Sequence, residues 1–166
     1  MEFLEIIKKR RSIRTYQKRG IHQQILESII DTARFAPTAR GVEPWEFIVI
    51  TESSILKNIA KVAEHGKFIA HASACIAVFC KNTKYYLEDG CAAVENILLA
   101  STTLGIATCW VAGDKKDYCD QIASMLNVPA ELKLVALISM GYPESENKFK
   151  IAEKRALTEV MHWNKY

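Results

Sequence analysis

A run of positive charge near the start of the chain, "KKRRSIRTYQ" at residues 8–17, holds the residue types best suited to bind an anion. Five of its ten residues are Lys or Arg, and Ser12 lies in the middle. In an extended segment Arg10, Ser12 and Arg14 alternate, so their side chains point to the same side. Two guanidinium groups and a hydroxyl can then bind one anion together, and a phosphate monoester suits their geometry. The spacing therefore predicts a phosphate-binding segment.

Helix electrostatics is a second interpretation of this run, and it requires no ligand. Phe3, Leu4, Ile6 and Ile7 repeat at helical spacing, which predicts an amphipathic helix that ends near the cations. Cations at the C-terminus of a helix are stabilised by its dipole, by about 0.3–1 kcal/mol each. The run alone leaves both interpretations open.

Nucleic acid is a third candidate partner for the basic run. The first 20 residues hold seven Lys and Arg against two Glu, whereas the whole chain has a net charge of only +3 at pH 7. The remainder of the chain is therefore slightly acidic. Binding to a long polyanion is favoured by basic residues spread over a surface. We therefore expect a small, local anion and no nucleic-acid partner.

The rest of the sequence contains no arrangement that predicts a catalytic or metal centre made of side chains. It lacks G-x-G-x-x-G, G-x-x-x-x-G-K-[ST], G-x-S-x-G and H-E-x-x-H. His71 and Cys75 stand four residues apart, but no second pair stands at zinc spacing, so we expect no metal site. If the protein is an enzyme, a bound cofactor is expected to carry the reaction.

The composition predicts a cytoplasmic protein. The number of cysteines is odd, at five, and none forms a C-x-x-C pair, which is typical of reduced thiols in a reducing compartment. The start of the chain places apolar residues before its charges, the reverse of a secretion signal. The longest apolar stretch, residues 91–111, is interrupted by Glu95, Asn96 and Gly105, so we expect no membrane span.

The chain length and the hydrophobic periodicity predict one domain, residues 1–166, with alternating helices and strands. Further helices are expected over residues 22–35, 53–66, 89–104 and 115–127, with a short one near residues 157–161. Strands are expected over residues 45–51, 74–80, 106–113 and 132–143. The helix over residues 89–104 is apolar nearly all round, which is typical of a core or a subunit interface.

Five segments, taken in order, resemble the nitroreductase family of FMN-dependent enzymes. The basic run resembles the family's R-R-S-x-R signature, and "ARFAPTARGVEPWEFIVI" is similar to its A-P-S-x-x-N-x-Q-P-W-x-F segment. "DGCAAVENILLASTTLGIATCWVAG" resembles the alanine-rich central helix and the strand that follows it. "LVALISMGYP" is similar to the closing strand, and "EKRALTEVMHW" resembles the K-x-R…H-W ending. The resemblance covers nearly the whole chain.

The family implies an α+β fold with a central, mostly antiparallel sheet flanked by helices. It also implies an obligate homodimer in which the C-terminal tail is exchanged between subunits and the central helix lies at the interface. One FMN is then held per active site, at that interface.

The resemblance also implies roles for the basic residues. Arg10 and Ser12 match positions that face the FMN phosphate, and Arg155 in the tail matches a second phosphate-binding arginine. Arg11 matches a position along the ribityl chain, and Arg14 one nearer the pyrimidine side of the ring.

Two further segments match family positions around the flavin ring. Pro37, Thr38 and Ala39 match the loop that reaches the flavin from the other subunit. Ala112 and Gly113 match backbone amides near the flavin N5 and O4.

Three more positions need separate mention. Lys67 matches a polar contact to the ring. Gly41 stands where the family commonly has Asn, and Glu43 where it commonly has Gln. A carboxylate in place of an amide loses hydrogen-bond donors, so no specific role is expected of these two positions.

The activity implied is that of an FMN-dependent oxidoreductase. NADH or NADPH would reduce FMN, and a nitroaromatic, quinone or related acceptor would then be reduced in a ping-pong hydride mechanism that needs no catalytic side chain. Two alternatives remain open. One is an FMN-binding or storage protein, and the other is a same-fold enzyme that performs dehalogenation, enone reduction or flavin cleavage.

Overall fold

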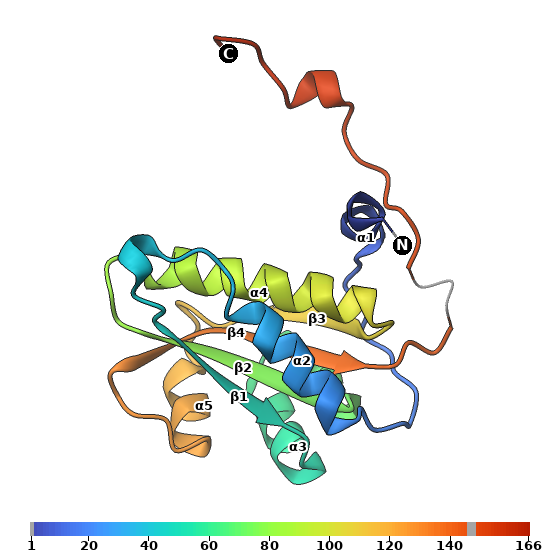
Figure 1. Cartoon of the computed structure of the whole chain (residues 1–166). Coiled ribbons are helices and arrows are strands. Elements are labelled where there is room, and N and C mark those ends of the chain that lie inside the picture. Colours follow the sequence, from blue (N-terminus) through green and yellow to red (C-terminus); the bar gives the residue numbers. More distant parts are fainter. Residues whose placement is uncertain (1, 146–148) are drawn as a thin grey trace.

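The protein forms a four-stranded antiparallel sheet with helices on both faces (Figure 1). The computed structural model describes residues 2–145 and 149–166. The strands are β1 (Trp45–Ile50), β2 (Ala74–Lys81), β3 (Ala107–Ala112) and β4 (Leu132–Gly141), in the spatial order β1-β2-β4-β3. The predicted α+β fold with an antiparallel sheet is therefore confirmed.

The helices agree with the predicted ones in number and order, but several differ at their ends. They are α1 (Phe3–Lys9), α2 (Gln23–Ala33), α3 (Ser53–Val62), α4 (Tyr86–Thr103) and α5 (Cys119–Met125), with short 3-10 turns η1 (Ala39–Gly41), η2 (Lys67–His71) and η4 (Leu157–Glu159). Helix α3 ends early because Ala63 is extended, and α5 starts late because Lys115 adopts a left-handed turn with φ 60°. The tail forms only a single 3-10 turn.

The hydrophobic core has two layers, one on each side of the sheet. Helices α2 and α4 cover one face, and α3, α5 and η2 cover the other (Figure 1). In β2, Ile76 and Val78 point to the first layer while Cys75, Ala77 and Phe79 point to the second. The continuously apolar run over residues 74–80 is therefore buried on both faces, as its pattern predicts.

Helix α4 crosses the sheet at close range. An added Cβ at Gly90 would lie 2.8 Å from a methyl group of Val135 on β4, so a larger residue there would push the helix off the sheet. The helix begins at Tyr86 rather than at residue 89, and Asp89 lies in its first turn. None of the helices in the described part of the chain is long and apolar enough to cross a membrane.

The C-terminal tail, residues 149–166, leaves the body near α1 and extends away from it (Figure 1). It exposes six large hydrophobic side chains: Ile151, Leu157, Val160, Met161, Trp163 and Tyr166. Burial of such side chains stabilises each by about 1.5–3 kcal/mol. The apolar side chains of the tail therefore remain exposed in a single chain.

Candidate functional site

The basic segment, defined here as residues 10–14, is extended and runs beside the edge strand β3. Ser12 forms an isolated parallel bridge with Thr108, and the Ile13 amide donates to the Thr108 carbonyl at 2.9 Å. Ile13 is buried, whereas Ser12 and Arg14 are exposed. Pairing with β3 therefore holds the basic segment in an extended conformation. This is the conformation on which the prediction for Arg10, Ser12 and Arg14 depends.

Cys109 on β3 lies next to the basic segment. Burial raises the pKa of Cys109, whereas the Arg14 charge, the Ser12 hydroxyl and the Arg10 charge act to lower it. Ser12 and Arg14 are exposed on either side of the buried Ile13, so these two side chains lie on the same side of the extended segment. The same side is expected of Arg10 from its spacing.

Helix electrostatics explains only part of the positive charge. Helix α1 ends at Lys9, and its last turn contains Lys8 and Lys9, of which Lys8 pairs with Glu5 at 3.1 Å. Arg10 caps the helix, and the segment that follows is not helical. The helix dipole acts within the last turn, so the charges on Arg11 and Arg14 require another explanation.

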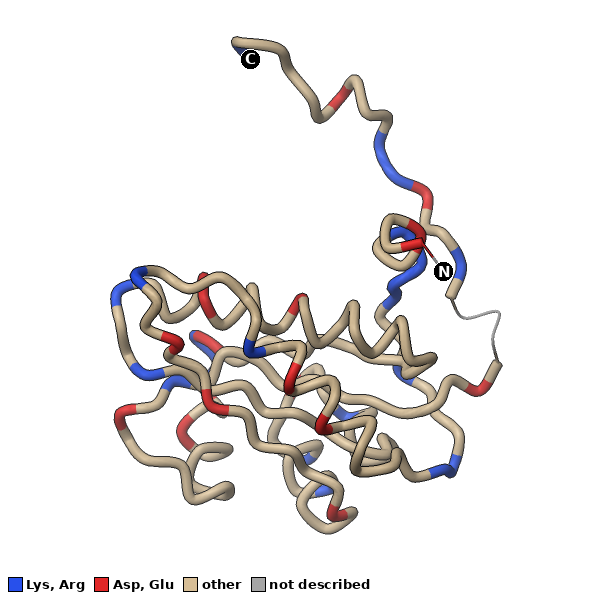
Figure 2. The backbone as a smooth tube through the Cα atoms, in the orientation of Figure 1, with Lys and Arg blue, Asp and Glu red and all other residues tan. Residues whose placement is uncertain are grey.

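The arginines of the basic segment form no close ion pairs with described residues, although the charge of Arg10 acts on Glu95 of α4 and opposes the rise that burial causes in the pKa of that carboxyl. No ion pair between residues 2–145 and 149–166 includes Arg10, Arg11 or Arg14. The Nη2 of Arg11 is buried without a hydrogen-bond partner among these residues. An unsatisfied buried donor costs about 1–3 kcal/mol, and more when it is charged. Figure 2 shows the run of Lys and Arg along the backbone where α1 ends. A phosphate or another oxygen-rich anion fits this set of donors.

The amide of Ala112 faces the open edge of the same strand. The Gly113 amide donates to the Val135 carbonyl of β4 at 3.1 Å. Successive residues of an antiparallel strand direct their backbone groups to opposite sides. The Ala112 amide therefore points away from β4, toward the edge along which the basic segment lies. The Gly113 amide is already hydrogen-bonded to β4.

Three side chains hold the turn that follows β3. Tyr118 donates to the Ala112 carbonyl, and the Cys119 thiol lies 2.6 Å from the Gly113 carbonyl. The Tyr86 hydroxyl donates to Asp114 at 2.5 Å, and this bond, with burial and the charge of Asp114, raises the pKa of Tyr86 to about 12. Tyr86 thus stays a protonated donor at neutral pH, and the backbone at Ala112 is fixed before any ligand binds.

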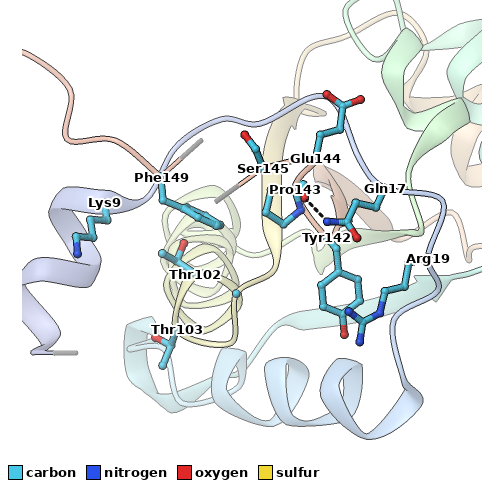
Figure 3. Close-up of a pocket in the computed structure, with 11 residues that line it drawn as sticks. Lys9, Gln17, Arg19, Thr102, Thr103, Tyr142, Pro143, Glu144, Ser145 and Phe149 are labelled. Atoms are coloured by element: carbon cyan, nitrogen blue, oxygen red, sulfur yellow. Dashed lines mark hydrogen bonds between the residues drawn. The ribbon is translucent and has the colours of Figure 1, made fainter. Parts of the chain in front are cut away.

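The residues predicted around the flavin ring are not all brought together. Ala39 lies at the N-terminal end of α4, where its amide donates to Asp89 at 3.0 Å. Lys9, which directly precedes the basic segment, lines a pocket with Thr102 and Thr103 at the C-terminal end of α4 (Figure 3). The loop of residues 37–39 and the basic segment are thus separated along α4 within one chain (Figure 1).

Lys67 and Arg155 also lie apart from the basic segment. The Lys67 ammonium donates to the Lys61 carbonyl at 2.8 Å and so caps the end of α3. Its neighbour Phe68 lies beside the basic segment, since the Arg14 guanidinium is 5.6 Å from the centre of the Phe68 ring. Arg155 is exposed in the tail. The roles predicted for these residues stay predictions.

The pocket in Figure 3 has a volume of about 680 Å³, and two of its polar side chains, Gln17 and Arg19, already have partners. The Gln17 amide donates to the Pro143 carbonyl at 2.7 Å, and the Arg19 guanidinium stacks 3.9 Å above the Tyr142 ring. We assign no ligand to it.

Comparison with known proteins shows which family the chain resembles over most of its length. The chain matches the sequence profile of the nitroreductase family over residues 7–79 and 81–142. A protein of Archaeoglobus fulgidus, provisionally named an NADH dehydrogenase/NAD(P)H nitroreductase, is 34% identical over 172 residues, and 99% of each chain is covered. Human iodotyrosine deiodinase 1 is 24% identical over 197 residues, which cover 96% of this chain and 68% of that protein.

Solved structures share the fold over nearly the full length. The FMN-dependent nitroreductase of Clostridium difficile R20291 has a TM-score of 0.88 at 28% identity, and 98% of this chain and 99% of that chain are covered. A Bacteroides thetaiotaomicron protein, provisionally named an NADH dehydrogenase/NAD(P)H nitroreductase, has a TM-score of 0.92 at 26% identity, with coverage of 99% and 98%. With the profile match and the archaeal relative, these similarities establish that the chain belongs to the nitroreductase family.

Proposed function

We propose that the protein is an FMN-dependent oxidoreductase that uses NAD(P)H to reduce nitroaromatics, quinones or related acceptors. One observation carries the proposal. Arg10, Ser12 and Arg14 alternate along an extended segment held beside β3, Ser12 and Arg14 are exposed, and none of the ion pairs between described residues includes these arginines. The name of the Clostridium difficile relative, an FMN-dependent nitroreductase, supports the choice of anion.

Each residue of the basic segment has a distinct task in this proposal. Arg10 and Ser12 bind the phosphate, since a guanidinium and a hydroxyl together supply several donors to its oxygens. Arg11 directs its free Nη2 along the ribityl chain. Arg14 lies nearer the ring, and the Ala112 amide donates to the ring edge. FMN, when bound, supplies the hydride chemistry, so the chain needs only to bind, orient and polarise.

Arg14→Ala is expected to lower the reduction potential of bound FMN. Reduction adds negative charge to the ring, and a guanidinium nearby stabilises that charge more than the oxidised state. A loss of about 1.4 kcal/mol corresponds to a shift of about 30 mV for a two-electron couple. Spectroelectrochemical titration of the holoprotein measures this shift. Arg14→Lys is the matched control, because it keeps the charge and should keep most of the potential. An unchanged potential in Arg14→Ala would remove Arg14 from this role.

The complete site is proposed to form in a homodimer. Three observations support two subunits: the loop of residues 37–39 lies away from the basic segment, the tail is exposed, and α4 is apolar nearly all round. In this arrangement Pro37, Thr38 and Ala39 contact the flavin held by the partner. The exchanged tail brings Arg155 to a phosphate, and its apolar side chains are buried on the other subunit.

Reductive dehalogenation is a second candidate reaction. The observation that favours it is the similarity to human iodotyrosine deiodinase 1 along 96% of this chain. It would use the same flavin site with a halogenated aromatic as the acceptor. Release of halide from a halotyrosine in the presence of reduced protein distinguishes this reaction from nitro or quinone reduction.

Steady-state consumption of NADH and NADPH with added menadione or nitrofurazone tests the proposed activity. Turnover that depends on both the donor and the acceptor, with parallel lines in a double-reciprocal plot, is the expected result. Bound FMN without turnover of any acceptor would instead indicate an FMN-binding or storage protein.

A further inference from the structure

The loop of residues 38–43, here called the 38–43 loop, adopts an unusual backbone. Arg40, Gly41 and Glu43 have φ values of 61°, 64° and 49°, in the left-handed region that non-glycine residues rarely occupy. Each such non-glycine residue costs on the order of 1–3 kcal/mol and persists only where surrounding contacts enforce it. Contacts with the rest of the protein must therefore hold the loop in this conformation.

Within the loop, the hydrogen bonds converge on two residues. The Gly41 amide donates to the Thr38 carbonyl at 3.3 Å, and the Val42 amide donates to the Ala39 carbonyl at 3.4 Å. The Glu43 amide donates to the Thr38 hydroxyl at 3.1 Å. These bonds fix the shape of the loop but not its position on the protein, because donors and acceptors move together.

Asp89 supplies the contact that positions the loop. Its Oδ1 accepts the Ala39 amide at 3.0 Å, across 50 residues of sequence, and so caps the first residue of η1. Asp89 is only 6% exposed, and no ion pair between described residues includes it. A small cavity of about 80 Å³, lined by Ala39, Arg40 and Asp89 among others, separates the loop from residues 83–85.

A buried carboxylate without a cation is costly, so its retention calls for a physical reason. The N-terminus of α4 offsets part of the cost, since Asp89 lies in the first turn, where the helix dipole favours an anion. Glu88, on the same turn, would serve the dipole equally well and is exposed. The dipole therefore does not require burial of Asp89, whereas the bond to Ala39 does.

We propose that Asp89 is a positioning residue that fixes the 38–43 loop in the place from which it binds the flavin of the partner subunit. The inference rests on the proposed function, because it assigns the loop to a flavin site. Asp89 itself touches no flavin: it acts through the Ala39 amide. Because Asp89 belongs to α4, its bond to Ala39 fixes the loop relative to that helix before the flavin binds. Little conformational entropy is then lost when the flavin binds.

The test compares Asp89→Ala and Asp89→Asn with Glu88→Ala as the matched control on the same helical turn. Asn keeps an oxygen that can accept from Ala39, whereas Ala does not. Hydrogen exchange of the Ala39 amide, measured by NMR on the FMN-free protein, is expected to be at least about tenfold faster in Asp89→Ala. The dissociation constant for FMN, measured by quenching of its fluorescence, is expected to rise roughly tenfold. Asp89→Asn should restore most of both values, and Glu88→Ala should change neither.

Asp89→Ser keeps the test decisive if Asp89→Ala fails to fold. It keeps a polar group in the first turn of α4, but its shorter side chain withdraws the oxygen from the Ala39 amide, so it should likewise speed exchange of that amide and weaken FMN binding. The proposal is overturned if Ala39 exchange is unchanged in Asp89→Ala, or in Asp89→Ser where Asp89→Ala does not fold, or if exchange is faster while FMN affinity is unchanged. If the unaltered protein binds no FMN, the proposed function fails, and so does the flavin role of Asp89. The exchange measurement, which needs no flavin, then still decides whether Asp89 anchors the loop.

Discussion

Arg10→Ala is expected to weaken FMN binding by about 10- to 100-fold, because it removes a charge-assisted hydrogen bond worth about 1.5–3 kcal/mol. The spacing places Arg10 on the same side of the segment as Ser12 and Arg14, and none of the ion pairs in the described part of the chain includes it. Titration of FMN with FMN-free protein, followed by fluorescence quenching, measures the change. The weakening should diminish for riboflavin, which lacks the phosphate.

Arg19→Ala is the matched control for this change. It removes the same type of side chain from the same basic first 20 residues, but the Arg19 guanidinium stacks on Tyr142, 3.9 Å from the centre of its ring. FMN affinity should therefore stay within about threefold of the unaltered protein, since loss of a surface charge alone changes little. Equal weakening by both variants would indicate a general effect of positive charge. It would contradict a specific phosphate contact at Arg10.

Deletion of the tail, residues 149–166, is expected to abolish stable dimer formation and to weaken FMN binding at least about 100-fold. The tail exposes several large apolar side chains, among them Trp163, which is 80% exposed in the single chain. Burial of such side chains against a partner supplies about 1.5–3 kcal/mol each before the cost of ordering. Light scattering after size exclusion should give a mass below the 18.7 kDa of one full-length chain for the shortened protein, and twice the full-length mass for the complete protein.

Arg155→Ala separates the two roles proposed for the tail. It leaves the apolar side chains in place, so the protein should remain a dimer while FMN affinity falls about tenfold. A shortened chain that still forms dimers and still binds FMN would contradict the exchanged tail. A monomeric full-length protein that binds FMN tightly would contradict the two-subunit site.

Much of the fold is predictable because local pattern and tertiary structure agree. The apolar run over residues 74–80 has no polar residue to place in solvent, so it predicts a strand covered on both faces, and β2 is such a strand. The ends of the helices are less predictable. Helix α4 extends back to Tyr86 because Asp89 caps η1 instead of its own helix, a tertiary contact with no local signal.

The site is predictable only where the spacing along one segment determines it. Alternation alone places Arg10, Ser12 and Arg14 on one side, since period two is a property of any extended segment. Phe68 and Asp89 could not be found this way. Phe68 meets Arg14, and Asp89 meets Ala39, only after distant segments pack together. The separation of the 38–43 loop from the basic segment is likewise a property of the fold and not of the sequence pattern.

The measurement that tests the central claim most directly is the visible absorption spectrum of the purified protein, with the chromophore identified after denaturation. The account predicts a yellow protein that absorbs near 450 nm, as flavins do, and releases about one FMN per chain. A colourless protein that also fails to bind added FMN would contradict it. The basic segment would then bind another anion or remain solvated, and the proposed chemistry would not apply to this chain.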